Sequence, residues 1–245
     1  MSSSGIDRVV VAMDGPSGSG KSSTARGVAS RLGLRYLDTG AQFRAVTAWM
    51  IEQGVDFEDP DAIAARSAEP ELVSGTDPQD PTITVDGKDV AVAIRSQEVT
   101  THVSAVASVP DVRRRLLRLQ RMIIGEGGIV VEGRDIGSVV APDAEVKVFL
   151  TADPSARAAR RTKEAGADDV DATQADLLRR DKIDSGRTAA PLTMAEGATH
   201  LDTTPYSLDE VIQQVVDIVD EAVGAKAGSG SDGGSDSGSS SGSTG

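Results

Sequence analysis

The stretch RVVVAMDGPSGSGKSSTARGVASRL, residues 8–32, decides the fold. A β-branched run at 9–11 predicts a buried strand. Apolar residues then recur at helical spacing from Ala25 to Leu32, and Gly33 is the kind of residue that ends a helix. The stretch therefore predicts a strand, a glycine-rich turn and a helix, in that order.

The turn between this strand and helix carries a phosphate-binding motif. Residues 15–22, GPSGSGKS, match the pattern G-x-x-x-x-G-K-[ST] at every position. Glycines let the backbone bend so that successive N–H groups point inward at a helix N-terminus, which makes a site for anions. The Lys21 amine can then reach the β- and γ-phosphates, and the Ser22 hydroxyl can bind magnesium. Because strand and helix flank the motif as it requires, we interpret it as a nucleoside triphosphate site and not as a chance match in a flexible loop. The residues assigned to the nucleotide are Gly15, Pro16, Ser17, Gly18, Ser19, Gly20, Lys21, Ser22 and Ser23.

The bulk composition excludes several classes of function. With 245 residues and 38% hydrophobic content, the chain can bury the core of one α/β domain or two small ones. A net charge of −13 argues against a general nucleic-acid or anionic-membrane surface. The absence of cysteine excludes disulfides and thiolate metal sites and suits a reducing compartment. The N-terminus lacks a signal-peptide pattern, and no apolar run approaches the roughly 20 residues that span a bilayer. We therefore expect a soluble cytoplasmic protein without nucleic-acid or membrane partners. We also expect it to act as a monomer.

The basic residues are unevenly divided, with 19 Arg against 6 Lys. The planar guanidinium group binds phosphate at two points, so clusters of Arg in an acidic protein indicate small anionic ligands. Ordinary surface arginines explain the composition equally well. Only the positions of these arginines can distinguish between the two interpretations.

Strand-like and helix-like segments alternate along the rest of the chain, which predicts a parallel sheet covered by helices on both faces. Residues 56–100 differ, because their prolines and the Asp86-Gly87 turn signal predict a small β-hairpin insertion over the main sheet. Arg-bearing helices near 154–190 are placed where a mobile cover could form. The further expected strands are 34–38, 128–135, 145–151 and 200–202.

A phosphate-binding loop alone fits motors, GTPases, transporters, helicases and small-molecule kinases. The guanine-reading sequence N-K-x-D is absent, which disfavours a GTPase, and the chain is too short for a pair of helicase domains. Charged residues and one threonine, at strand ends and in the Arg-rich region, remain to be explained. They are Asp38, Thr39, Arg44, Arg134, Asp135, Arg180, Asp184 and Arg187.

Five motifs together resemble a known family. They are GPSGSGKSS (15–23), LDTGAQFR (37–44), IRSQEV (94–99), VEGRDIGSVVAPDA (131–144) and RRDKIDSGRTAAPL (179–192). In this order they are similar to the bacterial cytidylate kinases, within the nucleoside monophosphate (NMP) kinase family.

The resemblance implies a P-loop NTPase fold of the three-layer α/β type over residues 6–224. It implies an inserted NMP-binding segment at about 40–107 and a short lid at about 154–188. Residues 225–245 fall outside the family pattern, and from residue 228 onward they consist of Gly, Ser, Asp and Thr, which predicts a disordered tail. The implied reaction transfers a phosphoryl group from ATP, with Mg²⁺, to CMP or dCMP. Such a transfer needs alignment and charge neutralisation more than a general base.

By position, the resemblance assigns the acceptor phosphate to Arg44 and Arg134. It assigns the cytosine base to Ser104, Arg113 and Asp135, because a carboxylate can accept from the exocyclic amine. Thr39 stands at the family's Ser/Thr position near the same pocket. Phe43 stands where the family often has Tyr, so a hydroxyl contact is lost there while ring packing can survive.

In the lid region, the resemblance assigns the sugar hydroxyls to Arg180 and Asp184. Arg187 is expected to close over the transferring phosphoryl group with Arg157, Arg160 or Arg161. For the last three, ordinary ion pairs on a helix surface are an equally good interpretation. Lys21, Arg134, Arg180 and Arg187 form the expected catalytic set.

Two alternatives stay open on the sequence. The chain could be another small P-loop kinase, acting on a different monophosphate or on shikimate. It could also be a nucleotide-binding regulatory protein that no longer transfers phosphate, although intact Lys21, Arg134 and Arg187 argue against this.

Overall fold

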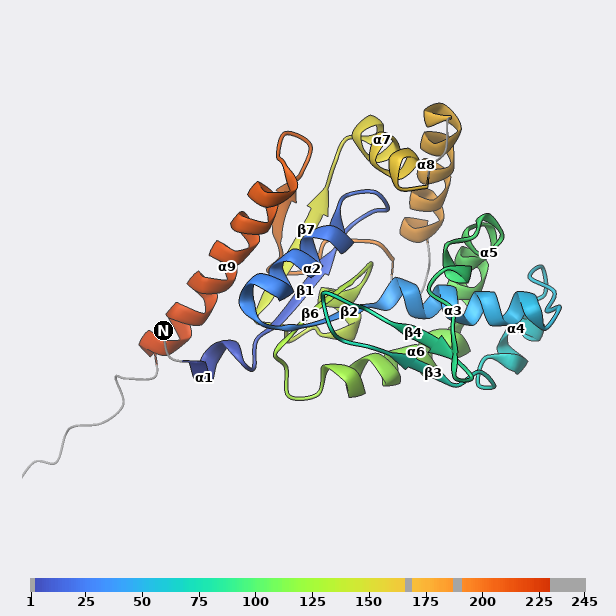
Figure 1. The fold of residues 1–245 in the computed structure, drawn as a ribbon, viewed down its shortest axis with the longest axis horizontal. Coiled ribbons are helices and arrows are strands. Elements are labelled where there is room, and N and C mark those ends of the chain that lie inside the picture. The colour runs from blue at the N-terminus through green and yellow to red at the C-terminus, as the bar shows by residue number, and fades with distance from the viewer. Residues whose placement is uncertain (1–2, 166–168, 187–190, 230–245) are drawn as a thin grey trace, which may run out of the picture.

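The computed structural model describes residues 3–165, 169–186 and 191–229 (Figure 1). Within these ranges a parallel five-stranded sheet, called the main sheet below, has the strand order β2-β6-β1-β7-β8. β1 is central, and the chain places strands on both sides of it, so the sheet has a switch point beside β1. The expected parallel α/β fold is confirmed. The strands are β1 (Val10–Asp14), β2 (Arg35–Asp38), β6 (Ile129–Gly133), β7 (Val146–Thr151) and β8 (Thr199–Asp202).

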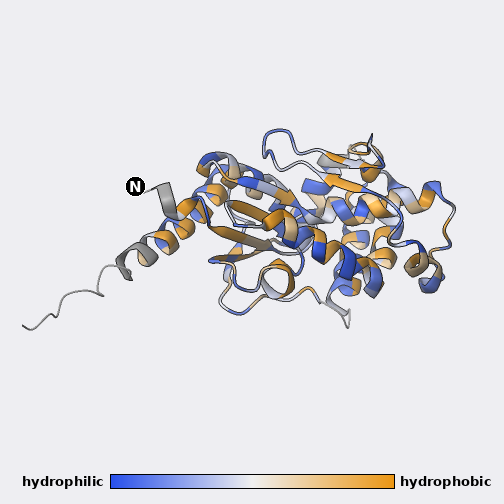
Figure 2. Ribbon diagram, turned by 90° about the horizontal axis from the view of Figure 1, so that it is seen from below, coloured by the Kyte–Doolittle hydropathy of each residue, from blue (hydrophilic) through white to orange (hydrophobic). Residues whose placement is uncertain are grey.

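Helices cover both faces of the main sheet (Figure 1). Val11 and Met13 of β1 pack in one hydrophobic cluster with α2 (Lys21–Leu32) and α9 (Leu208–Ser229). Ala12, between them in sequence, belongs to a second cluster with α6 (Pro110–Ile124) and the helical turn η2 (Ile136–Val140). Because alternate strand residues point to opposite faces, this division produces the three layers. Figure 2 shows the apolar strands between helices of mixed hydropathy.

The inserted segment lies between β2 and β6. Its elements are α3 (Thr39–Glu52), α4 (Pro60–Arg66), β3 (Leu72–Ser74), β4 (Ile83–Val85), β5 (Lys88–Asp89), η1 (Ala93–Arg95) and α5 (Gln97–Ser108). The predicted hairpin is present: Asp86 and Gly87 both have positive φ, 50° and 75°, as a two-residue hairpin turn requires. Sequence reasoning missed β3, which pairs with β4 and completes a small antiparallel sheet.

From the sequence we expected this small sheet to lie over the main sheet. It packs on α3 instead. Ile83 and Val85 join Trp49 of α3, Val106 of α5 and Leu116 of α6 in a third hydrophobic cluster. The segment therefore has an apolar core, which it shares with helices that lead into and out of it.

The lid region consists of α7 (Pro154–Ala165) and α8 (Val170–Gly186), which pack against each other above the phosphate-binding end of the sheet (Figure 1). Both helices lie within the Arg-bearing region near 154–190 that the sequence indicated. α9 continues to Ser229, so the helix includes the first residues of the stretch 225–245 that we had assigned to a tail. The short helix α1 (Ser3–Ile6) packs beside α9.

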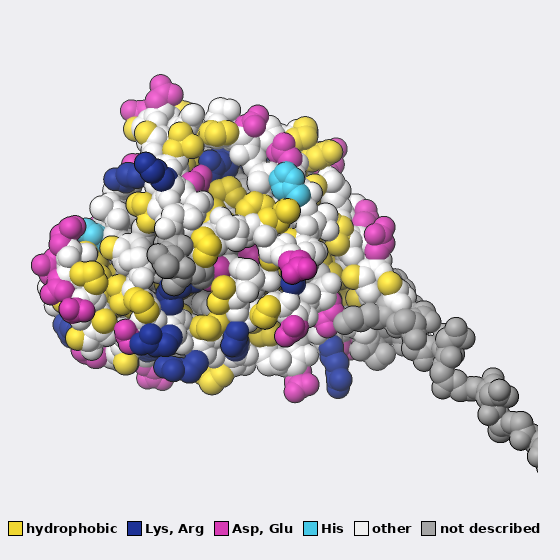
Figure 3. Space-filling model, turned by 180° about the vertical axis from the view of Figure 1, so that it is seen from behind, with side chains coloured by type: hydrophobic (Ala, Val, Ile, Leu, Met, Phe, Trp, Pro, Cys, Tyr) yellow, Lys and Arg dark blue, Asp and Glu magenta, His cyan; other side chains and the backbone are white. Residues whose placement is uncertain are grey.

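The surface agrees with the acidic composition. On the face seen in Figure 3, Lys and Arg side chains are scattered among Asp, Glu and hydrophobic ones and form no continuous basic field. No helix in the described part of the chain is long and apolar enough to cross a membrane.

Candidate functional site

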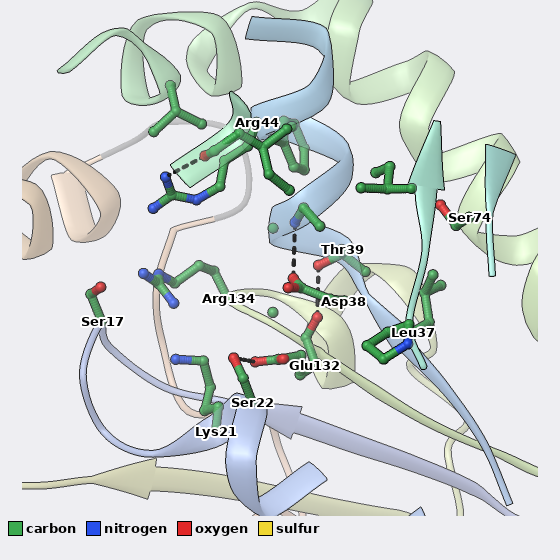
Figure 4. Close-up of a pocket in the computed structure, with 18 of the residues that line it drawn as sticks. Ser17, Lys21, Ser22, Leu37, Asp38, Thr39, Arg44, Ser74, Glu132 and Arg134 are labelled. Atoms are coloured by element: carbon green, nitrogen blue, oxygen red, sulfur yellow. Dashed lines mark hydrogen bonds between the residues drawn. The ribbon is translucent and has the colours of Figure 1, made fainter. Parts of the chain in front are cut away.

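Charged residues meet at one edge of the main sheet because three neighbouring strands end there together. Asp14 of β1 pairs with Gly133 of β6, and Asp38 of β2 pairs with Glu132. A cavity of about 440 Å³ opens beyond these strand ends, between the main sheet, α3, α5 and α8 (Figure 4). This is the edge at which open α/β sheets bind ligands.

Most of the site residues predicted from the sequence line this one cavity. They are Ser17, Gly18, Gly20, Lys21, Ser22, Ser23, Thr39, Arg44, Ser104, Arg113, Arg134, Asp135, Arg161, Arg180 and Asp184. Gly15, Pro16 and Ser19 do not line it; Gly15 and Ser19 are buried, and Pro16 is partly buried. Arg187 lies outside the described residues.

The phosphate-binding loop has the conformation that its glycines predict. Gly20 has a φ of 89° and is the N-cap of α2, so the helix N-terminus opens into the cavity. Gly15 leaves β1 with a φ of 148°, where a Cβ atom would collide with the carbonyl of Leu150. A side chain at either position would be strained, which explains the two outer glycines of the motif.

Lys21 extends along the inside of this loop. Its Nζ donates a hydrogen bond of 2.7 Å to the carbonyl of Pro16. Burial, and next the positive charge of Arg134, lower the pKa of Lys21 to about 7, while Glu132 opposes both effects. An anionic ligand beside Nζ would restore the charged form.

Glu132 is the main site residue that sequence reasoning missed. Its Oε2 accepts a hydrogen bond of 2.9 Å from the Ser22 hydroxyl, and its Oε1 accepts one of 2.5 Å from the Tyr36 hydroxyl. Burial and the nearby Asp38 raise the pKa of Glu132 to about 7, and Lys21 lowers it. A buried strand that ends in an acid, directly before Gly133-Arg134-Asp135, was the signal that could have identified it.

Three arginines line the part of the cavity that faces the phosphate-binding loop. Arg134 donates to the Gly15 carbonyl at 2.9 Å and to Oδ2 of Asp184 at 3.0 Å. Burial, together with the positive charge of neighbouring arginines, lowers the pKa of Arg44 to about 9 and that of Arg180 to about 10. Both values lie above neutral pH, so these guanidinium groups stay charged and this wall attracts anions.

Asp135 and Arg113 form a buried ion pair at the side of the cavity near α5 and α6. The guanidinium carbon of Arg113 lies 5.6 Å from the centre of the Phe43 ring, a cation–π contact. Phe43 therefore keeps a packing role although it has no hydroxyl. Ser104 of α5 lines the same part of the cavity.

The arginines of α7 have separate environments. Arg157 is 4% exposed and donates to the Ser17 carbonyl and to Asp181, so it is a buried contact of the phosphate-binding loop and not a surface ion pair. Arg160 donates to the hydroxyl and carbonyl of Thr203. Arg161 lines the cavity, whereas the other two do not.

Asp14 connects the phosphate-binding loop to the turn that follows β6. Its two carboxylate oxygens accept hydrogen bonds of 2.8 Å from the backbone N–H groups of Ile136 and Gly137. Asp14 is 3% exposed, and burial raises its pKa to about 6, against the two hydrogen bonds, which lower it. The contact holds the turn that carries Arg134 and Asp135.

We expect Asp14→Asn to lower the free energy of unfolding by about 1–3 kcal/mol at pH 7.5, because an amide NH₂ would face a buried N–H. The deficit should be larger at pH 5. The raised pKa of Asp14 gives the wild type a stabilising contribution that is present at low pH and lost as the pH rises through about 6. Urea unfolding of both proteins at the two pH values measures this. The exposed Asp143→Asn is the matched control, and an equal deficit at both pH values would contradict the prediction.

The fold and site together define a P-loop kinase: a phosphate-binding loop on a parallel sheet, an Arg-lined cavity, an inserted segment and the helix pair α7 and α8 beside the cavity. The sequence matches the family model described as cytidylate kinase over residues 11–221. The chain belongs to the cytidylate kinase family, which confirms the resemblance, and it is a phosphotransferase of the nucleoside monophosphate kinase class.

Curated relatives match this sequence over most of their length. The cytidylate kinase of Streptomyces avermitilis is 57% identical over 217 residues, 88% of this chain and 94% of that one. The cytidylate kinase of Streptomyces griseus is 56% identical over 214 residues, 86% of this chain and 93% of that one. Among solved structures, shikimate kinase from Acinetobacter baumannii in complex with shikimate is 13% identical with a TM-score of 0.47, over 89% of this chain and 96% of that one. At that TM-score the likeness carries no argument about the substrate.

Proposed function

We propose that this kinase transfers the γ-phosphoryl group of Mg²⁺-bound ATP to CMP or dCMP, giving ADP and CDP or dCDP. One observation carries the proposal: a single cavity joins the phosphate-binding loop to the Arg113–Asp135 pair. A triphosphate at the loop and a monophosphate anchored by its base at the pair would bring their phosphates together beside Arg44, Arg134 and Arg180.

The donor set beside Lys21 fits magnesium. Mg²⁺ prefers oxygen ligands and is commonly held by one or two protein oxygens together with nucleotide phosphates. The Ser22 hydroxyl and the Glu132 carboxylate, 2.9 Å apart, supply such oxygens next to the loop. When bound, the metal would supply positive charge that compensates the charge of the nucleotide phosphates. The described residues contain no cluster of three or more His, Cys, Asp or Glu that could hold a metal ion.

The site has no need of a general base, because the attacking group is already an anionic phosphate. Both histidines are occupied elsewhere. His102 stacks on Phe57 with ring centres 4.3 Å apart, and His200 bonds the Thr151 hydroxyl at the end of β7. Arg44, Arg134 and Arg180 would align the two phosphates and compensate their charge, which is what phosphoryl transfer requires.

The sugar and the lid complete the proposal. Asp184 is 6% exposed and faces the cavity beside Arg180, where an acceptor and a donor could bind the sugar hydroxyls. Arg161 would reach the donor phosphates from α7. A role for Arg187 rests on the sequence motif alone.

The Arg113–Asp135 pair would distinguish cytosine from uracil. A carboxylate accepts a hydrogen bond from the exocyclic amine of cytosine, while a guanidinium donates to N3 and O2. Uracil has an acceptor and an N–H at the corresponding positions, so both contacts would be mismatched.

Asp135→Asn should lower kcat/KM for CMP by about tenfold to a hundredfold, since a hydrogen bond to a charged group is lost. It should narrow the CMP/UMP ratio by at least about tenfold, because an amide NH₂ can donate to O4 of uracil. Steady-state kinetics with both nucleotides measure the ratio. Asp111→Asn is the matched control, because Asp111 pairs with Arg114 on the exposed side of α6. An unchanged ratio would remove Asp135 from base recognition.

The substrate assignment is tested by coupled ADP release with CMP, dCMP, UMP, AMP and GMP. The proposal expects CMP and dCMP to be turned over far faster than the other three. Faster turnover of UMP or AMP would make the protein a kinase of another monophosphate. ATP binding without any acceptor-dependent ADP release would favour the regulatory alternative.

We also propose that the enzyme acts as a cytoplasmic monomer. The cavity already holds the phosphate-binding loop, the arginines and the Arg113–Asp135 pair, which supports a monomer as the active species. Sedimentation of the purified protein during turnover would test this, and a dimer as the active species would contradict it.

A further inference from the structure

The hydroxyl of Tyr36 has a contact that the proposed function does not use. Tyr36 is 2% exposed and lies on β2, while Glu132, 3% exposed, lies one residue before the end of the neighbouring strand β6. The hydroxyl donates a hydrogen bond of 2.5 Å to Oε1 of Glu132.

Several contacts hold the Tyr36 side chain in place. Its ring packs in the apolar cluster beneath α2 and α9, with Val28 and Ala29 among the buried members. Its backbone belongs to β2, opposite Val130 of β6, and its N–H donates to the Thr76 carbonyl at 2.8 Å. The hydroxyl is therefore delivered to Glu132 by a rigid strand and a packed ring.

The two carboxylate oxygens of Glu132 therefore have different hydrogen-bond partners. Oε1 is engaged by Tyr36, and Oε2 faces the Ser22 hydroxyl at 2.9 Å. Without the Tyr36 hydroxyl, the carboxylate would keep only its hydrogen bond with the Ser22 hydroxyl and would be less firmly oriented. In metal sites, a hydrogen bond from a neighbouring group commonly fixes the orientation of the residue that binds the ion.

We infer that Tyr36 is a positioning residue for magnesium: its hydroxyl orients Glu132 so that Oε2 and the Ser22 hydroxyl face the same ion. This inference rests on the proposed function in one respect, that Ser22 and Glu132 hold the metal of the nucleotide. Packing alone does not require the hydroxyl, because phenylalanine would fill the same apolar cluster. A buried hydroxyl without a hydrogen-bond partner destabilises the fold, so a tyrosine at this position requires its hydrogen bond to Glu132.

Tyr36→Phe removes the hydroxyl and keeps the ring. Titration calorimetry should measure ATP binding twice for each protein, with EDTA and with saturating Mg²⁺. Binding without metal should stay within about twofold of the wild type, because the phosphate-binding loop is untouched. The strengthening of ATP binding by Mg²⁺ should fall by about tenfold, at the lower end of the effect that residues supporting metal ligands have.

The chain contains two tyrosines, and Tyr206 offers the matched control. Tyr206 is 42% exposed and lies before α9, so Tyr206→Phe should leave both ATP affinities unchanged. Glu132→Gln should reduce the effect of Mg²⁺ at least as strongly as Tyr36→Phe. In the Glu132→Gln background, adding Tyr36→Phe should cause no further loss, since the group that Tyr36 orients is gone.

Two outcomes would overturn the inference: an unchanged Mg²⁺ effect in Tyr36→Phe, or an equal further loss in the Glu132→Gln background. If Tyr36→Phe does not fold, Tyr206→Phe leaves Tyr36 as the single tyrosine. Ultraviolet resonance Raman spectra of that protein should then show a change in the tyrosine hydrogen bond when Mg²⁺ is added to the ATP complex. An unchanged spectrum would contradict a contact with the metal ligand. None of these measurements uses CMP, so they separate a failure of this inference from a failure of the proposed substrate.

Discussion

Replacing Lys21 with alanine is expected to lower kcat by about a thousandfold or more, the largest loss from a single side chain in this protein. Lys21 follows the N-cap of α2, and its amine lies inside the phosphate-binding loop, 2.7 Å from the Pro16 carbonyl. No other amine reaches this point in the described residues that line the cavity. Charge that develops on the transferring group would lose its nearest cation in a buried site, where electrostatic interactions are strong.

Steady-state kinetics with saturating ATP and CMP measure this effect, and calorimetry reports whether ATP still binds. Lys88→Ala is the matched control, because Lys88 is exposed on β5 in the inserted segment. Circular dichroism of the Lys21 variant establishes that it is folded. A folded variant with kcat within tenfold of the wild type would show that the loop binds phosphate without assisting transfer.

Arg134→Gln should lower kcat by about a thousandfold, the scale for an arginine that stabilises charge in phosphoryl transfer. Arg134 contacts the phosphate-binding loop through the Gly15 carbonyl and the lid helix α8 through Asp184, so it stands where donor and acceptor would meet. Arg134→Lys keeps the charge but cannot make both bonds from a planar group, so we expect an intermediate loss.

The KM for ATP should change far less than kcat, because the loop itself is unaltered. Arg121→Lys is the matched control. Arg121 donates to the Val139 and Val140 carbonyls beside η2 and does not line the cavity. If Arg134→Lys and Arg121→Lys lowered kcat equally, Arg134 would act through the stability of the fold.

Much of this architecture is predictable from short-range patterns. Residues 8–32 specify a strand, a loop and a helix because the spacing of apolar residues and the positions of glycine act locally. The Asp86-Gly87 turn is predictable for the same reason, since it needs two residues with positive φ. β3 was missed because a strand of three residues, Leu72–Ser74, is too short to show a period.

The contacts that side chains make with distant parts of the chain were less predictable. Arg157, Arg160 and Arg161 lie on one helix, and the sequence does not distinguish their roles. In the structure their contacts differ. Arg157 contacts the phosphate-binding loop, Arg160 contacts Thr203, and Arg161 lines the cavity. A pattern on α7 shows which residues share a face, but not what lies opposite that face.

The sequence by itself determined the phosphate-binding loop, the parallel α/β class, the family, and the Arg and Asp residues of the motifs. Only the tertiary structure assigned partners to Asp14, Tyr36 and Glu132. Tyr36 and Glu132 are 96 positions apart, and they meet because β2 lies beside β6 and not beside β1. Strand order depends on how helices pack on both faces of the sheet, and local spacing does not contain that information.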